Sequence, residues 1–226
     1  MRHLVTGAGS GIGEALADVL HARADELVLL ARNEQRAEDL RDRYAGADVR
    51  IADLADPGSI AAAVTGLDRL DSLVHVAGVF ELAGIADLPL AELTNQLTVN
   101  LVAPAELTRA VLPALRSARG TVVFVNSGAG LTANPQWGAY AASKFGLRAI
   151  ADALRAEEAP AGVRVTSVFP GRTATPMQQK VHDQEGRDYD PAAWTTPGSV
   201  AATIVHVLDL SPDATISDVT VRPRPH

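Results

Sequence analysis

A tyrosine and a lysine in the second half of the chain have the spacing of a proton-transfer pair. Tyr140 and Lys144 lie four residues apart in a stretch predicted to be helical, so the phenol and the ammonium share one helix face. A free tyrosine has a pKa of about 10, and a neighbouring cation favours the phenolate and lowers that pKa. We therefore expect Tyr140 to act as general acid in carbonyl reduction, or as general base in alcohol oxidation.

Two further observations support this pair, whose spacing alone occurs by chance on many helices. Of the 20 basic residues only Lys144 and Lys180 are lysine, so a compact ammonium is kept here in a chain that otherwise uses arginine. Ser127 follows a predicted strand, and the carboxyl ends of strands face the ligand crevice in α/β sheets. Its hydroxyl is expected to hydrogen-bond a substrate oxygen as negative charge develops there.

A glycine-rich turn joins the first predicted strand to the first predicted helix. It reads Thr-Gly-Ala-Gly-Ser-Gly-Ile-Gly over residues 6–13, and no Gly-Lys-Ser/Thr follows, which excludes a Walker A loop. Glycines let backbone N–H groups approach a pyrophosphate, and the helix N-terminus adds partial positive charge. The expected dinucleotide contacts are Gly7, Gly9, Ser10, Gly11, Ile12 and Gly13.

An arginine at the end of the second predicted strand indicates which dinucleotide is bound. The segment 29–33 lacks the acidic residue that would bind a free ribose 2′-hydroxyl. Arg32 instead offers a fork suited to a 2′-phosphate, and Arg36 lies one turn further on. We therefore expect NADP(H) rather than NAD(H). The alternative is a solvated arginine at a helix entrance.

Short apolar runs alternate with longer periodic segments, which predicts a parallel sheet covered by helices on both faces. The expected fold is a three-layer α/β/α Rossmann domain over residues 1–226, with a seven-stranded, mainly parallel sheet. Segment 173–195 is polar and irregular, and we expect it to cover the substrate. The predicted strands are Arg2–Thr6, Glu26–Ala31, Asp48–Ala52, Ser72–Ala77, Thr121–Asn126, Val163–Phe169 and Ile216–Val221. The predicted helices are Gly11–Ala22, Glu34–Tyr44, Pro57–Gly66, Leu90–Ser117 (bent or broken at Pro104 and Pro113), Trp137–Ala159 and Pro197–Leu208.

Composition narrows the classes of function. The formal net charge of -7 argues against a nucleic-acid partner, which needs clustered cations. The chain has no cysteine, so thiolate metal sites and cysteine nucleophiles are excluded, and the six histidines show no metal-ligand spacing. Neither a cleavable leader nor a long apolar segment is apparent. We expect a cytoplasmic protein that binds neither metal nor membrane.

Taken together, these motifs resemble the short-chain dehydrogenase/reductase family over essentially the whole chain. The resemblance implies that Tyr140 is the acid/base, that Ser127 polarises the substrate carbonyl, and that Lys144 binds the nicotinamide ribose. It implies that Asn100 holds a water in a proton relay. It further implies cofactor contacts from Tyr140, Lys144, Asp53, Leu54, Ala77, Gly78, Pro170, Gly171, Thr173 and Thr175, with Val168 lining the nicotinamide face.

One departure from the family pattern follows the fourth predicted strand. The family commonly reads Asn-Asn-Ala-Gly there, whereas this chain reads His75-Val-Ala-Gly. The family's asparagines tie the central sheet together, so the hydrogen bonds in that region are expected to differ. We expect His75 to be a packed, satisfied residue rather than a catalytic one.

The sequence indicates the class of substrate less directly than it indicates the reaction. Apolar side chains suggest a small hydrophobic carbonyl compound, although each could equally belong to the core. The family's paired long helices imply a homodimer or homotetramer. A catalytically silent NADP-binding regulatory or structural protein is the alternative, and an epimerase or dehydratase that uses the bound cofactor is a further one. The expected substrate contacts are Ser127, Tyr140, Gly128, Phe80 and Met177, with Leu131, Trp137 and Trp194 as further pocket walls.

Overall fold

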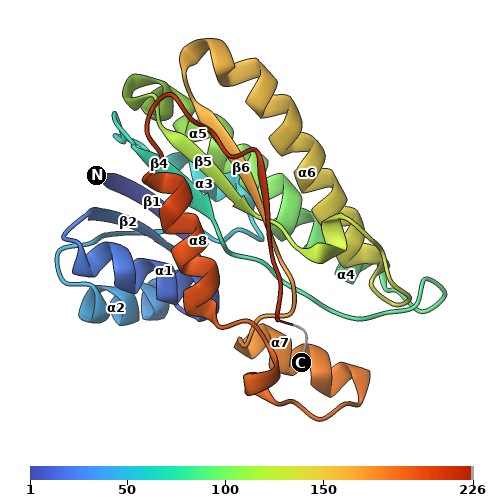
Figure 1. The fold of residues 1–226 in the computed structure, drawn as a ribbon. Coiled ribbons are helices and arrows are strands. Elements are labelled where there is room, and N and C mark those ends of the chain that lie inside the picture. Colours follow the sequence, from blue (N-terminus) through green and yellow to red (C-terminus); the bar gives the residue numbers. More distant parts are fainter. Residues whose placement is uncertain (225–226) are drawn as a thin grey trace.

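Seven strands form one parallel sheet in the order β3-β2-β1-β4-β5-β6-β7. The structure is a computed structural model that describes residues 1–224 (Figure 1). The predicted fold class is confirmed, with strand ends displaced by at most a few residues. The strands are β1 (Arg2–Thr6), β2 (Glu26–Ala31), β3 (Asp48–Ile51), β4 (Ser72–His75), β5 (Thr121–Val125), β6 (Arg164–Pro170) and β7 (Asp218–Val221).

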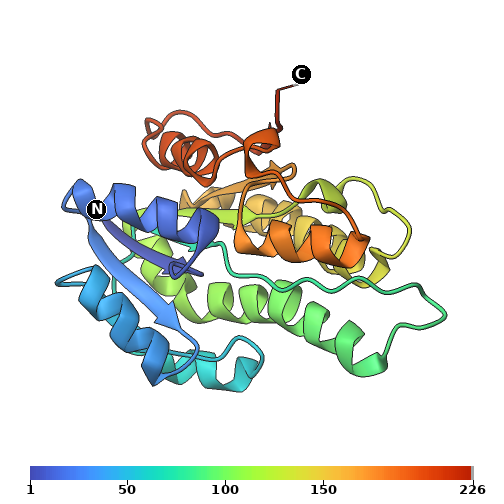
Figure 2. The same ribbon diagram turned by 90° about the horizontal axis from the view of Figure 1, so that it is seen from below.

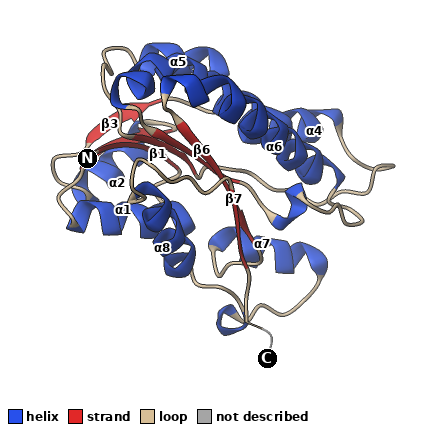
Figure 3. Ribbon diagram, turned by 45° about the horizontal axis from the view of Figure 1, so that its top comes forward, coloured by secondary structure: helices blue, strands red, loops and turns tan. Residues whose placement is uncertain are grey.

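Helices cover both faces of the sheet, as Figure 3 shows. One face carries α1, α2 and α8, and the other carries α3, α5 and α6. The α-helices are α1 (Gly11–Ala22), α2 (Glu34–Arg43), α3 (Ile60–Ala63), α4 (Leu90–Leu97), α5 (Ala103–Ala118), α6 (Gly138–Glu158), α7 (Pro176–Glu185) and α8 (Pro197–Leu208).

The two helical layers explain why the strands show no polar alternation. Leu4 and Val5 are adjacent in β1, and neither is exposed to solvent. Leu4 packs into the cluster formed with α5 and α6, whereas Val5 packs into the cluster formed with α1 and α8. Successive side chains of a strand point to opposite faces, so a strand covered twice needs apolar residues throughout.

The long helix predicted over Leu90–Ser117 is interrupted once, and not at both prolines. A π-helical turn, η2 (Thr98–Val102), separates α4 from α5, and Pro104 lies in the first turn of α5. At Pro113, where we expect a bend or a break, the helix is not broken, because α5 runs through this residue. Pro113 is exposed, so the carbonyl that loses its helical partner four residues earlier faces solvent.

The segment predicted to cover the substrate contains a regular helix. Thr175 caps α7 by accepting from the Gln178 N–H, and Gly186 ends it in the left-handed conformation. A short bridge between Thr173 and Thr195 brings the two ends of the segment together. In Figure 1, α7 stands below the main body. Within residues 1–224, no helix is both long and apolar enough to cross a membrane.

Candidate active site

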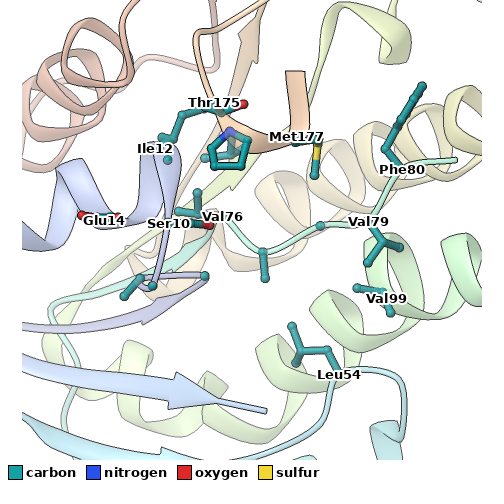
Figure 4. Close-up of a pocket in the computed structure, with 18 of the residues that line it drawn as sticks. Ser10, Ile12, Glu14, Leu54, Val76, Val79, Phe80, Val99, Thr175 and Met177 are labelled. Atoms are coloured by element: carbon teal, nitrogen blue, oxygen red, sulfur yellow. The ribbon is translucent and has the colours of Figure 1, made fainter. Parts of the chain in front are cut away.

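A deep cleft opens where the strand order of the sheet reverses. β1 and β4 are neighbours although β2 and β3 lie between them in sequence, and ligands bind at such switch points. The cleft has a volume of about 1390 Å³, and Figure 4 shows part of its wall. Of the predicted site residues it is lined by Gly7, Gly9, Ser10, Gly11, Ile12, Arg32, Asp53, Leu54, Ala77, Gly78, Phe80, Ser127, Gly128, Tyr140, Lys144, Pro170, Gly171, Thr173, Thr175 and Met177.

The glycine loop leaves the N-terminus of α1 open to the cleft. Ser10 is the N-cap residue, but its hydroxyl accepts no hydrogen bond from the helix. The first N–H groups of α1 therefore stay available to an anion. A Cβ added at Gly9 would meet no atom within 4 Å, which means that the space over the loop is clear. These features fit the diphosphate of a dinucleotide.

Gly13 lies behind this loop and outside the cleft lining, so the structure does not place it at the cofactor. A Cβ at this position would lie 2.0 Å from the carbonyl oxygen of Gly7. Glycine is needed here because the first turn of α1 packs directly on the backbone of the loop.

The far end of the cleft carries a cation that has no ion-pair partner among the described residues. Arg32 is exposed and lines the cleft, and nothing within residues 1–224 forms an ion pair with it. Arg36 also lines the cleft, but its guanidinium donates to Asp39 at 3.1 Å. One oxygen of Asp53 accepts from the Ala55 N–H, which fixes the turn after β3. In the part of the chain that the structure describes, Arg32 is thus the guanidinium left unpaired at this end.

The proton-handling residues come from β5 and α6. Ser127 follows β5, and its hydroxyl lies close enough to the phenol of Tyr140 on α6 to lower the pKa of that phenol. Lys144 lies one turn further along α6, where its Nζ donates to the carbonyl oxygen of Val125 at 3.0 Å. The Asn126 amide donates to the carbonyl oxygen of Lys144 at 3.0 Å and so joins strand to helix. The structure therefore brings Ser127, Tyr140 and Lys144 together at one end of the cleft.

Burial dominates the acid–base properties of this group. It raises the pKa of Tyr140, and the hydrogen bond with Ser127 opposes that rise without cancelling it. The sequence predicts a lowered pKa for the Tyr140 phenol. That prediction is wrong for the protein alone, in which the pKa is raised. The reason is geometric: the Lys144 Nζ lies over the face of the ring, 5.7 Å from its centroid, and donates to Val125. Burial also lowers the pKa of Lys144 to about 8.

Asn100 lies beneath the cleft rather than in its wall. It is 1% exposed and sits within the π-helical turn η2, an irregularity often found at functional sites. Its amide oxygen accepts from the Val79 N–H, and its amide nitrogen donates to the Val79 carbonyl and to Ser143. Both hydrogens of the amide group are therefore used, one to hold the chain that follows β4 and the other to bind α6. The water relay stays a prediction, and the side-chain amide has no donor left for it.

Aromatic rings close the substrate end of the cleft. Phe80 packs edge-on against Tyr140 with centroids 5.0 Å apart, and lies 4.7 Å from the ring of Trp137. Trp137 and Met177 also line the cleft. Leu131 and Trp194 lie outside the cleft lining.

Val168 also lies outside the cleft lining, because it is fully buried in the core against α1 and α8. Trp194 stacks under the guanidinium of Arg172, at 5.4 Å.

His75 is held by neighbours away from the cleft. Its Nε2 lies 2.9 Å from the hydroxyl of Thr108, which itself donates to Pro104, so the imidazole is the donor. Its ring stacks on Phe124. Burial, assisted by the charge of Lys144, lowers the pKa of His75 to about 3. The neutral imidazole is a packing residue, as predicted.

Several cleft residues were missed from the sequence. Val99 and Asn95 come from η2 and α4, and Val181 and Gln178 come from α7. The sequence does carry a signal for α7, because Thr175-Pro176 has the same cap-and-proline start as Thr196-Pro197 of α8. In the described residues 1–224, no three His, Asp or Glu side chains are grouped to hold a metal ion.

The glycine loop, Ser127, Tyr140 and Lys144 occur in this order along the chain and meet in one cleft of the sheet. A family model described as short chain dehydrogenase matches residues 2–186, and the chain belongs to that family.

Known proteins of the same family cover nearly all of the chain. It is 32% identical to the Dehydrogenase/reductase SDR family protein 7-like of Drosophila melanogaster, over 97% of this chain and 73% of that protein. It is 30% identical to an uncharacterized oxidoreductase of Staphylococcus epidermidis, over 97% of this chain and 96% of that one. The crystal structure of a short-chain dehydrogenase from Streptomyces avermitilis superposes with a TM-score of 0.83 at 27% identity, covering 97% and 87% of the two chains.

Proposed function

We propose that this oxidoreductase uses NADP(H) to reduce the carbonyl group of a small hydrophobic substrate, or to oxidise the corresponding alcohol. The observation that carries the proposal is the joint placement of Ser127, Tyr140 and Lys144 where the glycine loop and the aromatic wall meet in one cleft.

The residues divide the chemistry between them. The bound nicotinamide supplies or accepts the hydride at the substrate carbon. Ser127 and the Tyr140 hydroxyl bind the substrate oxygen, and in reduction the phenol proton passes to that oxygen as the carbon is reduced. Lys144 places a charge over the face of the Tyr140 ring and offers its remaining donors to a ribose. Phe80 and Trp137 keep water from the reacting carbon.

The preference for NADP(H) rests on Arg32. Its guanidinium is the one in the cleft that has no carboxylate partner within residues 1–224. The end of β2 carries this arginine and no acidic residue that would bind a ribose 2′-hydroxyl. A 2′-phosphate would receive a charge-assisted, bidentate contact there.

The substrate class rests on the side chains around Tyr140. Phe80, Trp137 and Val181 form one apolar cluster with the phenol, and Met177 lines the same end of the cleft. Aromatic and branched aliphatic ketones suit such a wall better than charged oxo-acids.

A second copy of the chain is the proposed partner. The outer faces of α5 and α6 enclose an apolar groove lined by Val102, Gly146 and Ile150, and Val102 is 48% exposed. Two copies related by a twofold axis would bury this face against itself. Sedimentation of the protein and of Val102→Glu tests this: a dimer or tetramer that dissociates in the variant supports it, and a monomeric wild type refutes it.

The direct test of the activity combines a cofactor titration with a substrate panel. NADPH or NADH is mixed with the protein and with aliphatic, aromatic and carboxylated ketones, and nicotinamide oxidation is followed. Oxidation of NADPH by hydrophobic ketones supports the proposal. Tight NADPH binding without oxidation across the panel would instead indicate a catalytically silent dinucleotide-binding protein.

A further inference from the structure

Two residues one turn apart on α7 hold the chain that follows β4. The Lys180 ammonium donates to the carbonyl oxygen of Phe80 at 3.3 Å and forms an ion pair with Glu81 at 2.5 Å. The Gln184 amide donates to the other Glu81 carboxylate oxygen and accepts from the Leu82 N–H at 3.1 Å. Figure 2 shows the two segments side by side. Three consecutive residues, 80–82, are thus held from the α7 side.

The same stretch is anchored to the protein body from its buried side. Gln96 of α4 is fully buried and donates to the carbonyl oxygen of Glu81 at 3.1 Å. Asn100 holds both backbone groups of Val79. The chain after β4 is therefore fixed to α4 and η2, and α7 is the outer partner that closes on it.

The position of α7 determines what covers the phenol. Val181 follows Lys180 directly and packs into the cluster of Phe80, Ala129 and Tyr140. Phe80, whose carbonyl Lys180 holds, presents its ring edge-on to Tyr140. Tyr140 is consequently 8% exposed. A displacement of α7 would withdraw Val181 and release Phe80 together.

The segment that carries α7 is joined to the body through a narrow base. Ala174 donates its N–H to the Thr195 carbonyl at 2.8 Å, which closes the segment at both ends. Beyond this base, Arg172 pairs with Glu185 near the end of the helix at 2.7 Å. The contacts of Lys180 and Gln184 with residues 80–82 are the polar contacts made on the cleft side, so they are placed to set how far the helix closes.

We propose that Lys180 and Gln184 are positioning residues that hold α7 closed through Glu81 and thereby keep Phe80 and Val181 over Tyr140. This inference rests on the proposed function, because it assigns these residues a part in closing that site. Neither needs to touch the substrate, and Lys180 is half exposed, with 52% of its side chain accessible. This latch, formed by Lys180, Gln184 and Glu81, excludes water from the substrate carbonyl. The ring of Phe80 sets the size of the substrate that can enter.

The two tryptophans give a readout that does not depend on turnover. Trp137 packs on Phe80 within the cleft, whereas Trp194 lies against Arg172 outside the cleft lining. In a Trp194→Phe background, acrylamide quenching therefore reports on the cleft alone. Opening of α7 by Lys180→Met is expected to raise the quenching constant of Trp137 by up to about two-fold, since exposed ion pairs contribute modestly.

A double-variant cycle isolates the contact between the two charges. Lys180→Met and Glu81→Gln should each raise the ketone KM by about two- to five-fold, with a smaller effect on kcat. The double variant should be no worse than Lys180→Met alone, because that change already removes the ion pair that Glu81→Gln removes. Arg41→Met is the matched control: it breaks an ion pair of 2.7 Å with Glu34 on α2, away from the cleft lining.

The outcomes separate the latch from the activity. Greater quenching and a raised KM in both single variants, non-additive in the double variant and absent in Arg41→Met, support the latch. Unchanged quenching of Trp137 in Lys180→Met overturns it, as do additive effects in the double variant. If the wild type reduces no ketone, the proposed function fails, and the quenching cycle still decides whether Lys180 holds α7 closed.

Discussion

The Lys144 ammonium lies 5.7 Å from the centre of the Tyr140 ring and donates to the carbonyl oxygen of Val125, not to the phenol. The pair is therefore joined through the face of the ring and through the end of β5. Burial raises the pKa of the phenol and lowers that of the ammonium to about 8. At neutral pH the tyrosine is protonated, which is the form that a general acid for carbonyl reduction requires.

The buried ammonium should make the folding free energy depend on pH in the alkaline range. The folded-state pKa of Lys144 is about 8, against a model value of 10.5 for the free side chain. Between these values the unfolded chain binds the extra proton, so the free energy of unfolding rises as pH increases from about 8 to 10.5. The gain amounts to roughly 3 kcal/mol for such a difference in pKa.

Comparing the wild type with Lys144→Met by urea unfolding at pH 7 and pH 10.5 measures this term. The free energy of unfolding of Lys144→Met, relative to that of the wild type, should be higher at pH 7 than at pH 10.5. A difference between the two proteins that does not vary with pH would rule out a charged, buried Lys144.

His75 should make the protein sensitive to acid. Its pKa falls to about 3 in the folded chain, from a model value of 6.5, mainly because it is buried. As pH drops below about 6.5 the unfolded chain takes up a proton that the folded chain refuses, so stability is lost towards pH 3 by up to about 4–5 kcal/mol. His75→Asn should flatten this acid limb. Equal slopes for both proteins between pH 6.5 and pH 4 would contradict the assignment.

Much of this site follows from local sequence signals, and the exceptions have physical causes. The strand-to-helix turn, Ser127 and the α6 pair depend on spacing within single elements, which a sequence displays. The place of Asn100 depends on a π-helical turn that no residue type requires. The proton affinity of Tyr140 depends on how completely Phe80 and Val181 cover it, and both come from elements distant in sequence. The helix α7 was overlooked because its residues are polar, although its caps were readable.

Exchange of Arg32 for aspartate should reverse the cofactor preference. Losing a charge-assisted contact with the 2′-phosphate and adding a like charge should weaken NADPH binding by about 10- to 100-fold or more. NADH binding should change little. Arg41→Asp makes the same change of charge on α2, at a residue outside the cleft lining, and should leave both affinities within about two-fold. Equal loss of NADPH affinity in both variants would mean that Arg32 acts only through net charge.

Replacement by alanine should lower the free energy of unfolding at one glycine of this loop and leave it nearly unchanged at another. At Gly13 the added methyl would meet the Gly7 carbonyl oxygen at 2.0 Å, so Gly13→Ala should lower the free energy of unfolding by about 3 kcal/mol or more. At Gly9 the methyl enters open space, so Gly9→Ala should fold with nearly wild-type stability. Thermal unfolding compares them, and comparable stability of the two variants would show that Gly13 is not required for packing.

The proton donor itself is tested most directly by Tyr140→Phe, assayed side by side for NADPH binding and for ketone-dependent NADPH oxidation. The variant keeps the ring that packs on Phe80 and loses only the phenol hydroxyl near Ser127. We predict an NADPH affinity within about two-fold of the wild type and a kcat reduced by about 10²- to 10⁴-fold, the usual contribution of a positioned acid. Turnover within about ten-fold of the wild type would contradict the assignment of Tyr140 as the acid.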